Sequence, residues 1–434
     1  MLDLAYETAA PSIIKVIGVG GGGGNAVNHM FKEGIHDVSF VLCNTDNQAL
    51  RKAGIPRKIQ LGKTKTQGLG AGNRPDKAKE AAEESLDEIH KMLDDGTKMV
   101  FITAGMGGGT GTGAAPIIAR EAKNMDILTV GIVTVPFIFE GQKKINQALD
   151  GVEEMRKHVD ALLVINNERL CSIYPDLTFF NAFAKADDTL TIAAKSIAEI
   201  ITVEGYINLD FADVKSILKD GGVAIMSTGF GEGDKRVTKS IDDALNSPLL
   251  NNNDVFGAQK VLFNLYFSQE SPVTMEEVRE IDEFMVKFDP DVEVIWGAAI
   301  DNSLGDKVKM TLLATGFGIS NLPDMPANIP PKGIKTADSG KGVQPINMND
   351  EGATIKRIEE TYGKEAVDTI KSNQTRASFY IFSNESLDDD PLIEKIEQNP
   401  TYNRDKNFIR NIQNEHKTSS ETNSSASENT SIQF

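Results

Sequence analysis

The sequence predicts an α/β protein with a doubly wound parallel sheet, a long central helix, a second α+β domain and a disordered C-terminal tail. Three observations predict this fold class. Short apolar strands alternate with helical patterns in the first half of the chain, two of these strands run into glycine-rich turns, and one long helical stripe follows. Strands that alternate with helices pair in parallel, and such sheets bind ligands at the carboxyl ends of their strands.

The first strand, Ile13 to Ile17, runs directly into a glycine-rich turn. Residues Gly18 to Asn25 form this turn, and a helical pattern is predicted from Ala26 to Phe31. The turn satisfies the GxGxxG fingerprint, which alone is a weak signal. It is compatible with a dinucleotide site, with another nucleotide site or with a tight structural turn.

The next elements add polar groups at further strand ends. A strand from Phe40 to Cys43 ends in Asn44, Thr45 and Asp46, where an open α/β sheet would place a ligand. A single helix is predicted from Pro75 to about Asp94, because alanine and leucine recur there at helical spacing. Two more strands are predicted over residues 127–135 and 161–165.

The most unusual stretch is the second glycine turn, Gly105 to Gly113. It lies between a strand at Met99 to Thr103 and a helix that is expected to have Pro116 in its first turn. Backbone N–H groups without side chains in the way can surround an anion, and a helix N-terminus adds partial positive charge. The stretch therefore predicts a phosphate-binding turn. The Walker signature is absent, because Arg57 stands where Gly62-Lys63-Thr64 would require a glycine.

The second half of the chain begins with the long helix, predicted from Thr178 to about Thr202. Its apolar residues recur at spacings of three, four and seven, as a core-facing stripe requires. The α+β domain that follows has predicted strands over 223–228, 261–267, 292–300 and 308–315, and predicted helices from Arg236 to Leu245 and from Thr274 to Phe288.

Composition changes after Gly318, where proline, glycine and polar residues replace the apolar pattern. The pattern of residues 352–372 predicts no more than a transient helix. The expected organisation is a nucleotide-binding domain (12–177), a central helix (178–203), the α+β domain (204–319), a flexible linker (320–391), a short patterned peptide (392–410) and a disordered tail (411–434).

Composition also narrows the class of protein. The net charge of −18 argues against non-specific binding to nucleic acid or to an anionic membrane. Two cysteines without CxxC spacing argue against a disulfide framework or a zinc site. No signal peptide and no apolar run of about 20 residues is found, so a cytoplasmic protein is expected.

Three pairs of residues admit both a structural and a functional interpretation. In the structural interpretation, Glu140 and Lys144 form a solvated i,i+4 ion pair, and Phe183 and Asp187 lie one turn apart on a helix whose aromatic residue packs in the core. An aromatic face beside a carboxylate would also suit guanine, whose N1–H and exocyclic amine are donors. Asp210 with Asp213 fits a helix cap by spacing alone. Because the turns contain no Walker lysine and no evident base, the chain either only binds nucleotide or has its site completed by another surface.

The run Gly107 to Gly113 matches the signature of the tubulin/FtsZ family, and four other stretches resemble the FtsZ family in the family's order. These are Gly18 to Asn25, Asn44 to Asp46, Phe139 to Gly141 and Asn208 to Val214. The resemblance covers about residues 13 to 318. It implies a GTPase that polymerises head to tail into the ring of bacterial cell division at mid-cell. One subunit's acidic loop then completes the nucleotide site of the next.

The resemblance also implies roles for individual residues. Glu140 would bind ribose, Phe183 and Asp187 guanine, and Ala71 with Gly72 would sense the γ-phosphate. Lys144 and Asn44 would also contact the nucleotide, and Mg²⁺ would be held mainly through the phosphates. The remaining phosphate-binding residues would be Gly21, Gly22, Gly23, Gly24, Asn25, Gly108, Gly109, Thr110, Gly111 and Thr112. The catalytic residues would be Asn208, Asp210 and Asp213.

Two departures from the family pattern matter. Lysine stands at position 144 where arginine is usual, which keeps the charge but loses a bidentate fork. The peptide 392–410 resembles only loosely the family's C-terminal peptide, which binds membrane-tethering partners such as FtsA. The alternative function is a non-polymerising nucleotide-binding regulator of the same superfamily, which the intact Asp210 and Asp213 oppose. A dinucleotide-dependent oxidoreductase fails on the sequence, because Gly107 to Gly113 has no place in a dehydrogenase and no hydride-transfer constellation is present.

Overall fold

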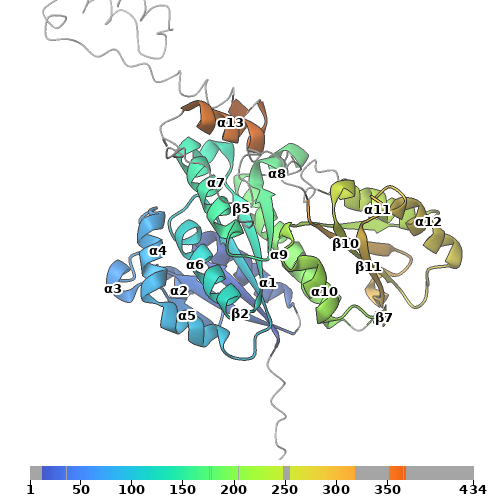
Figure 1. Cartoon of the computed structure of the whole chain (residues 1–434), viewed down its shortest axis with the longest axis horizontal. Helices are drawn as coiled ribbons and strands as arrows, with labels where there is room; N and C mark the ends of the chain where they lie inside the picture. Colours follow the sequence, from blue (N-terminus) through green and yellow to red (C-terminus); the bar gives the residue numbers. More distant parts are fainter. Residues whose placement is uncertain are drawn as a thin grey trace, which may run out of the picture. The chain divides into compact units, whose positions relative to one another are not determined.

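The computed structural model describes residues 12–317 apart from residues 36, 175, 177, 204 and 248–254, and residues 351–367 apart from residue 365. Six strands from residues 14–166 and one later strand, β8, form a parallel sheet in the order β3-β2-β1-β4-β5-β6-β8 (Figure 1). Its strands are β1 (Ile14–Val19), β2 (Val38–Asn44), β3 (Arg57–Gln60), β4 (Met99–Gly105), β5 (Leu128–Val135), β6 (Ala161–Asn166) and β8 (Gly222–Val223). The predicted doubly wound sheet is confirmed.

The strand order has one switch point, between β1 and β4. The chain moves outward from β1 through β2 to β3, and then outward on the other side from β4 through β5 to β6. In open α/β sheets, the crevice beyond the carboxyl ends of the strands at such a point binds ligands. Both glycine turns leave the sheet there.

Helices cover both faces of this sheet. One face packs on α1 (Gly20–Glu33) and α9 (Phe179–Thr202), and the other on α4 (Pro75–Glu84), α5 (Leu86–Leu93), α6 (Thr110–Asn124) and α7 (Gln142–Arg156). Three short helices, α2 (Asn47–Lys52), α3 (Lys63–Thr66) and α8 (Asn167–Ile173), and a 3₁₀ turn, η1 (Ile138–Glu140), complete the connections.

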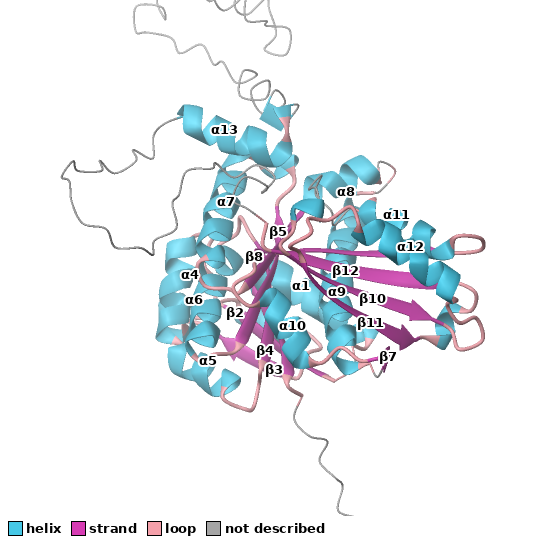
Figure 2. Cartoon of the chain, turned by 45° about the vertical axis from the view of Figure 1, so that its right-hand side comes forward, coloured by secondary structure: helices cyan, strands magenta, loops and turns pink. Residues whose placement is uncertain are grey.

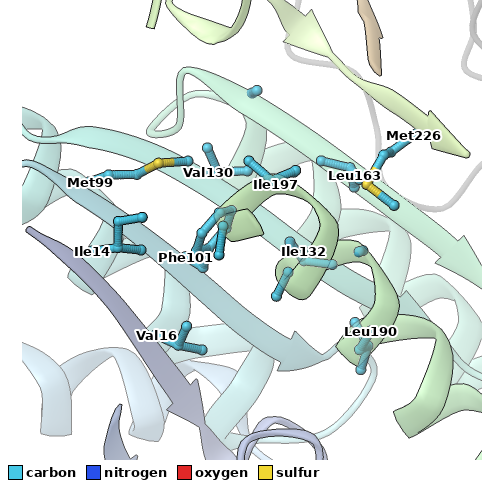
Figure 3. Packing of buried hydrophobic residues seen from close by; sticks show 14 of the residues in the cluster. Ile14, Val16, Met99, Phe101, Val130, Ile132, Leu163, Leu190, Ile197 and Met226 are labelled. Atoms are coloured by element: carbon cyan, nitrogen blue, oxygen red, sulfur yellow. The ribbon is translucent and has the colours of Figure 1, made fainter. Parts of the chain in front are cut away.

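The predicted central helix is α9, whose apolar stripe is buried. Leu190 and Ile197 lie among Phe101, Val130 and Ile132 of the first sheet (Figure 3). The same core cluster includes Met226, Leu262 and Leu313 of the second sheet. The helix therefore joins the two sheets through one continuous core.

The second sheet is mixed, in the order β7-β11-β10-β12-β9. It contains β7 (Gly205–Ile207), β9 (Ile225–Gly231), β10 (Lys260–Phe267), β11 (Glu293–Ile300) and β12 (Val308–Thr315). Helices α11 (Arg236–Leu245) and α12 (Met275–Met285) cover one of its faces through a separate apolar cluster (Figure 2). Helix α10 (Phe211–Leu218) and the 3₁₀ turns η2 (Val255–Gly257) and η3 (Asn302–Leu304) complete this part.

Several predicted element boundaries were wrong. Helix α1 begins at Gly20 rather than Ala26, and α6 begins at Thr110, so Pro116 is its seventh residue and not in its first turn. The helix predicted from Pro75 to Asp94 is two helices, separated at Ser85. The strand predicted over 223–228 divides at Ala224 into β8 of the first sheet and β9 of the second.

A further helix, α13 (Glu351–Tyr362), lies within the predicted linker 320–391 and packs against α7. The peptide 392–410 and the tail lie outside the described residues. Within the described part of the chain, no helix has the length and apolar character that a membrane crossing requires.

Candidate functional site

The two glycine turns meet at the switch point of the first sheet. Gly20, which opens α1, adopts a left-handed φ of +75°, and a Cβ there would lie 2.9 Å from the backbone nitrogen of Gly111. A Cβ at Gly23 would lie 2.2 Å from the carbonyl oxygen of Thr103 in β4. Only glycine allows this close approach. The N-termini of α1 and α6 therefore lie side by side.

Both helix N-termini are suited to bind an anion. Their N-cap residues, Val19 and Gly109, supply no side-chain acceptor to the first amides. In the first turn of α1, Gly21 and Gly22 are exposed. Because the first N–H groups of a helix have no partner within the helix, they are available to a phosphate, and the helix dipole favours its charge.

Two further segments lie against these turns, the loop after β2 and the stretch after α3. The Ala71 Cβ, from the second of these, lies 3.0 Å from the position that a Cβ on Gly109 would take. The hydroxyls of Thr45 and Thr110 are 2.7 Å apart, and the Asn44 carboxamide oxygen accepts a hydrogen bond from the Asp46 amide. The two glycine turns and these two segments thus lie together.

The loop after β5 carries Glu140 and Lys144. The Glu140 carboxylate accepts hydrogen bonds from the Phe137 amide (3.0 Å) and from Lys144 Nζ (3.1 Å). The i,i+4 ion pair expected from the spacing is present. Gly107 packs closely on the backbone of Lys144, so this loop adjoins the second glycine turn.

Phe183 and Asp187 lie in the N-terminal part of α9, beside the same loop. The ring of Phe183 stands edge-on to Phe137 at 5.0 Å, and Phe137 stacks on Phe139 at 5.1 Å. Burial raises the pKa of Asp187 to about 6, while His29 on α1 acts in the opposite direction and Asp188 adds to the increase. An aromatic surface and a carboxyl group therefore lie one helical turn apart at the edge of the site.

Asp210 and Asp213 form a reciprocal cap at the start of α10. Each carboxylate accepts a hydrogen bond from the other residue's amide, at 3.0 and 2.9 Å, and Asn208 accepts one from the Gly205 amide. The capping interpretation of the spacing is confirmed. Asp210 is nevertheless exposed, so it remains accessible to another molecule while it caps α10.

These acids lie far from the glycine turns of the same chain. The acids cap the first turn of α10, eight residues after the C-terminal end of α9, whereas the turns leave the carboxyl ends of β1 and β4, beside the N-terminal part of α9. The α9 residues from Phe183 to Thr202 span about 28 Å at 1.5 Å per residue. One chain therefore does not bring the acids to its own turns.

Comparison with known proteins identifies the family of this chain. Residues 13–175 match the family model of the tubulin/FtsZ family, GTPase domain, and residues 222–318 match that of the FtsZ family, C-terminal domain. The chain is 51% identical over 422 residues to the cell division protein FtsZ of Porphyromonas gingivalis, and the match covers 95% of this chain and 90% of that protein. The chain belongs to the FtsZ family.

Other FtsZ relatives give the same result. The cell division protein FtsZ of Aquifex aeolicus is 43% identical over 72% of this chain and 84% of its own length. The solved structure of an empty FtsZ dimer from M. jannaschii superimposes with a TM-score of 0.64 at 42% identity, covering 70% of this chain and 88% of that chain. CetZ2 from Haloferax volcanii, at 18% identity and a TM-score of 0.61, shares the fold.

A third FtsZ family match, described as FtsZ, C-terminal, covers residues 374–419. It contains the whole of the peptide 392–410 that the sequence pattern singled out. This match begins within the predicted linker 320–391 and lies in a part of the chain outside the described residues.

One residue of this FtsZ chain was missed by the sequence predictions. Asn167, directly after β6, is buried, and its carboxamide oxygen has no hydrogen-bond partner among the described residues. It lies at the same edge of the sheet as the glycine turns, where its carboxamide oxygen is available to a donor group. The pair Asn166-Asn167 at a strand end was the signal that could have revealed it.

Proposed function

We propose that the chain binds GTP, hydrolyses it and polymerises head to tail into the filaments of the cytokinetic ring of bacterial cell division. One observation carries the proposal: the acidic loop and the glycine turns lie at opposite edges of the first sheet. Each subunit therefore carries the glycine turns at one end and the acidic loop at the other. When the acidic loop of one subunit meets the glycine turns of the next, the same contact can repeat without closing into a ring of subunits, and a filament forms.

The nucleotide would lie across the switch point. Amides of Gly21 to Asn25 and of Gly108 to Thr112 would hold the phosphates, with Ala71 and Gly72 near the γ-phosphate. Three observations support this placement: the uncapped helix N-termini, the contact of Ala71 with Gly109, and the paired hydroxyls of Thr45 and Thr110.

The base and ribose would lie toward α9. Phe183 offers an aromatic face, Asp187 an acceptor for the two guanine donors, and Asn167 a further acceptor. Glu140 would accept from the ribose hydroxyls, and Lys144 would add positive charge. Because lysine binds phosphate as a point charge and not as a fork, we expect weaker phosphate binding than arginine would give.

Mg²⁺ would be held through the phosphates and water. The turns offer amides and hydroxyls, and within the described residues no group of three His, Cys, Asp or Glu side chains gathers as a metal site. Such a donor set fits an ion that arrives with the nucleotide. The ion would neutralise charge on the β- and γ-phosphates.

Hydrolysis would use the acidic loop of the next subunit. Asp210 and Asp213 would orient a water molecule toward the γ-phosphorus, and the bond to the β-phosphate oxygen would break to give GDP and phosphate. Their mutual capping fixes both carboxylates before any partner arrives. Asn208 would hold the preceding turn in place.

The surface beside this loop supports association with a second copy. On the edge strand β7, Tyr206 is 81% exposed, and Ile207 is exposed as well. On the adjoining strand β11, Val294 is exposed and Trp296 is 44% exposed. Exposed aromatic residues are typical of protein interfaces, and a contact along this sheet edge, next to the acidic loop, would deliver the carboxylates.

The dependence of hydrolysis on protein concentration tests this function. GTP turnover per subunit is expected to rise above a critical concentration, together with light scattering. Turnover per subunit that stays flat with concentration would show that one chain holds a complete site. A non-polymerising regulator of the superfamily would bind GTP without either change.

The pKa of Asp187 predicts a pH dependence of nucleotide affinity. A carboxylate accepts from guanine only when ionised, so affinity for GDP should fall about tenfold between pH 7.5 and pH 5, one unit below a pKa of about 6. The sign for stability is opposite: a raised carboxyl pKa makes the nucleotide-free protein more stable as the pH falls through 6. Calorimetry across this range should show a fall about tenfold smaller for Asp187→Asn, whose remaining pH dependence comes from the terminal phosphate of GDP, and equal profiles for the two proteins would contradict the role of Asp187.

At mid-cell, residues 392–410 would bind a membrane-tethering protein such as FtsA. Their place within the C-terminal family match supports this role. Deleting them should abolish binding of the tether and leave GTP hydrolysis intact; retained binding would refute it.

A further inference from the structure

Helix α13 docks on the GTPase domain although 35 residues separate it from the last strand, β12. Ile358, in the middle of the helix, is only 1% exposed. Arg357 pairs with Asp150 of α7 at 2.9 Å and approaches Glu153 at 3.8 Å. Figures 1 and 2 both show α13 beside α7. The helix is therefore a packed element of this domain.

The C-terminal end of α13 contacts the loop that carries Glu140. The Tyr362 hydroxyl donates a hydrogen bond of 2.8 Å to the carbonyl oxygen of Pro136, the residue after β5. The Tyr362 ring packs on the apolar cluster beneath α6 and α7. Burial raises the pKa of the Tyr362 hydroxyl, and the carboxylates of Glu140 and Glu168 act in the same direction.

The same end of α13 contacts the loop after β6. Asn166 donates through its side-chain amide to the carbonyl oxygen of Thr361 at 3.0 Å, and its carboxamide oxygen caps α8. The Glu168 carboxylate in turn accepts a hydrogen bond of 2.9 Å from the Ile138 amide of η1. Thr361, Asn166, Glu168 and Ile138 thus link the helix and both loops in one chain of contacts.

We propose that Tyr362 is a positioning residue for ribose recognition: docked α13 holds the Pro136–Glu140 loop in the geometry that presents Glu140 to the nucleotide. The inference rests on the proposed function, in which Glu140 binds the ribose hydroxyls. Tyr362 itself does not touch the nucleotide. It acts by restraining the backbone immediately before Phe137, whose amide is bound by the Glu140 carboxylate.

The test compares two ligands that differ only at the ribose. Nucleotide-free full-length protein is titrated calorimetrically, below its assembly concentration, with GDP and with 2′,3′-dideoxyguanosine diphosphate. Tyr362→Phe, which keeps the ring and loses the donor, should weaken GDP binding about fivefold, as loss of one hydrogen bond does. It should weaken binding of the dideoxy ligand less than twofold. Lys364→Ala, an exposed change just beyond the helix, is the matched control and should affect neither.

A second variant tests docking without nucleotide. Ile358→Asp places a charge at a buried position, so it should release α13 and speed amide hydrogen exchange at residues 137–140. Exchange that is unchanged there, or equal weakening of both ligands by Tyr362→Phe, would overturn the inference while leaving GTP binding intact. Wild-type protein that binds neither ligand would overturn the proposed function, and this inference with it.

Discussion

Replacing Asp213 by alanine is expected to reduce GTP hydrolysis by roughly two to four orders of magnitude, the usual effect of removing a group that activates water. The affinity for GDP should stay within twofold, because the acidic loop lies at the opposite edge of the sheet from the glycine turns. Filaments should still form and persist. Phosphate release, equilibrium nucleotide binding and light scattering measure the three quantities.

Asp213 also caps α10, so a matched control must separate catalysis from stability. Thr274 caps α12 in the same way, with a reciprocal bond to Glu277, and lies away from both halves of the site. Thr274→Ala should cost about 1 kcal/mol of stability and leave hydrolysis unchanged. If Asp213→Ala hydrolyses GTP at the wild-type rate, the acid has only its capping role.

The second large effect is expected at Gly108. A Cβ there would meet no atom within 4 Å, and the backbone is not left-handed, so Gly108→Asp should fold normally. Its carboxylate would face the proposed phosphates. Two like charges about 4 Å apart repel by about 4 kcal/mol near a protein surface, which is roughly a thousandfold loss of GDP affinity.

Gly54→Asp is the matched control for this variant. Gly54 also has no neighbour within 4 Å of a Cβ, and it lies after α2, outside the glycine turns. Both variants should melt near the wild-type temperature, and only Gly108→Asp should lose nucleotide. Undiminished binding by Gly108→Asp would show that the phosphates lie elsewhere.

The two inactive variants together probe the shared site. In a mixture, the turns of an Asp213→Ala subunit can meet the intact acids of a Gly108→Asp subunit. Hydrolysis that returns on mixing two inactive proteins requires a site made by two chains. A mixture as inactive as its components would argue against it.

Periodicity predicted most of the fold, and tertiary contacts account for its errors. The helix starting at Gly20 was missed because glycine has low helix propensity, and it is helical there through close packing on β4. Ser85 divides a helical pattern because its hydroxyl accepts a bond from the distant Gly62 amide. The periodicity of a short stretch of sequence does not reveal a contact between residues 23 positions apart.

The candidate site shows the same limit. Spacing predicted the Glu140–Lys144 ion pair and the Asp210–Asp213 cap, and both are confirmed. It could not place these pairs at two ends of one subunit, which depends on the course of α9. Nor could it dock α13, since the contacts of Tyr362 and Thr361 join residues more than 190 positions apart.

The separation of the acids from the glycine turns has an arithmetic consequence for short assemblies. A row of n such subunits contains n − 1 complete sites, since the turns at one end and the acids at the other remain uncovered. A dimer would therefore turn over at about half the limiting rate per chain, and a row of ten at about nine-tenths. In the proposed filament, the nucleotide at the uncovered end would be open to exchange from solution, and the nucleotides in complete sites would be covered. Exchange of GDP for GTP would therefore occur at the ends of such a polymer. Severing a filament would lower the rate of hydrolysis per subunit and would expose more nucleotide to exchange.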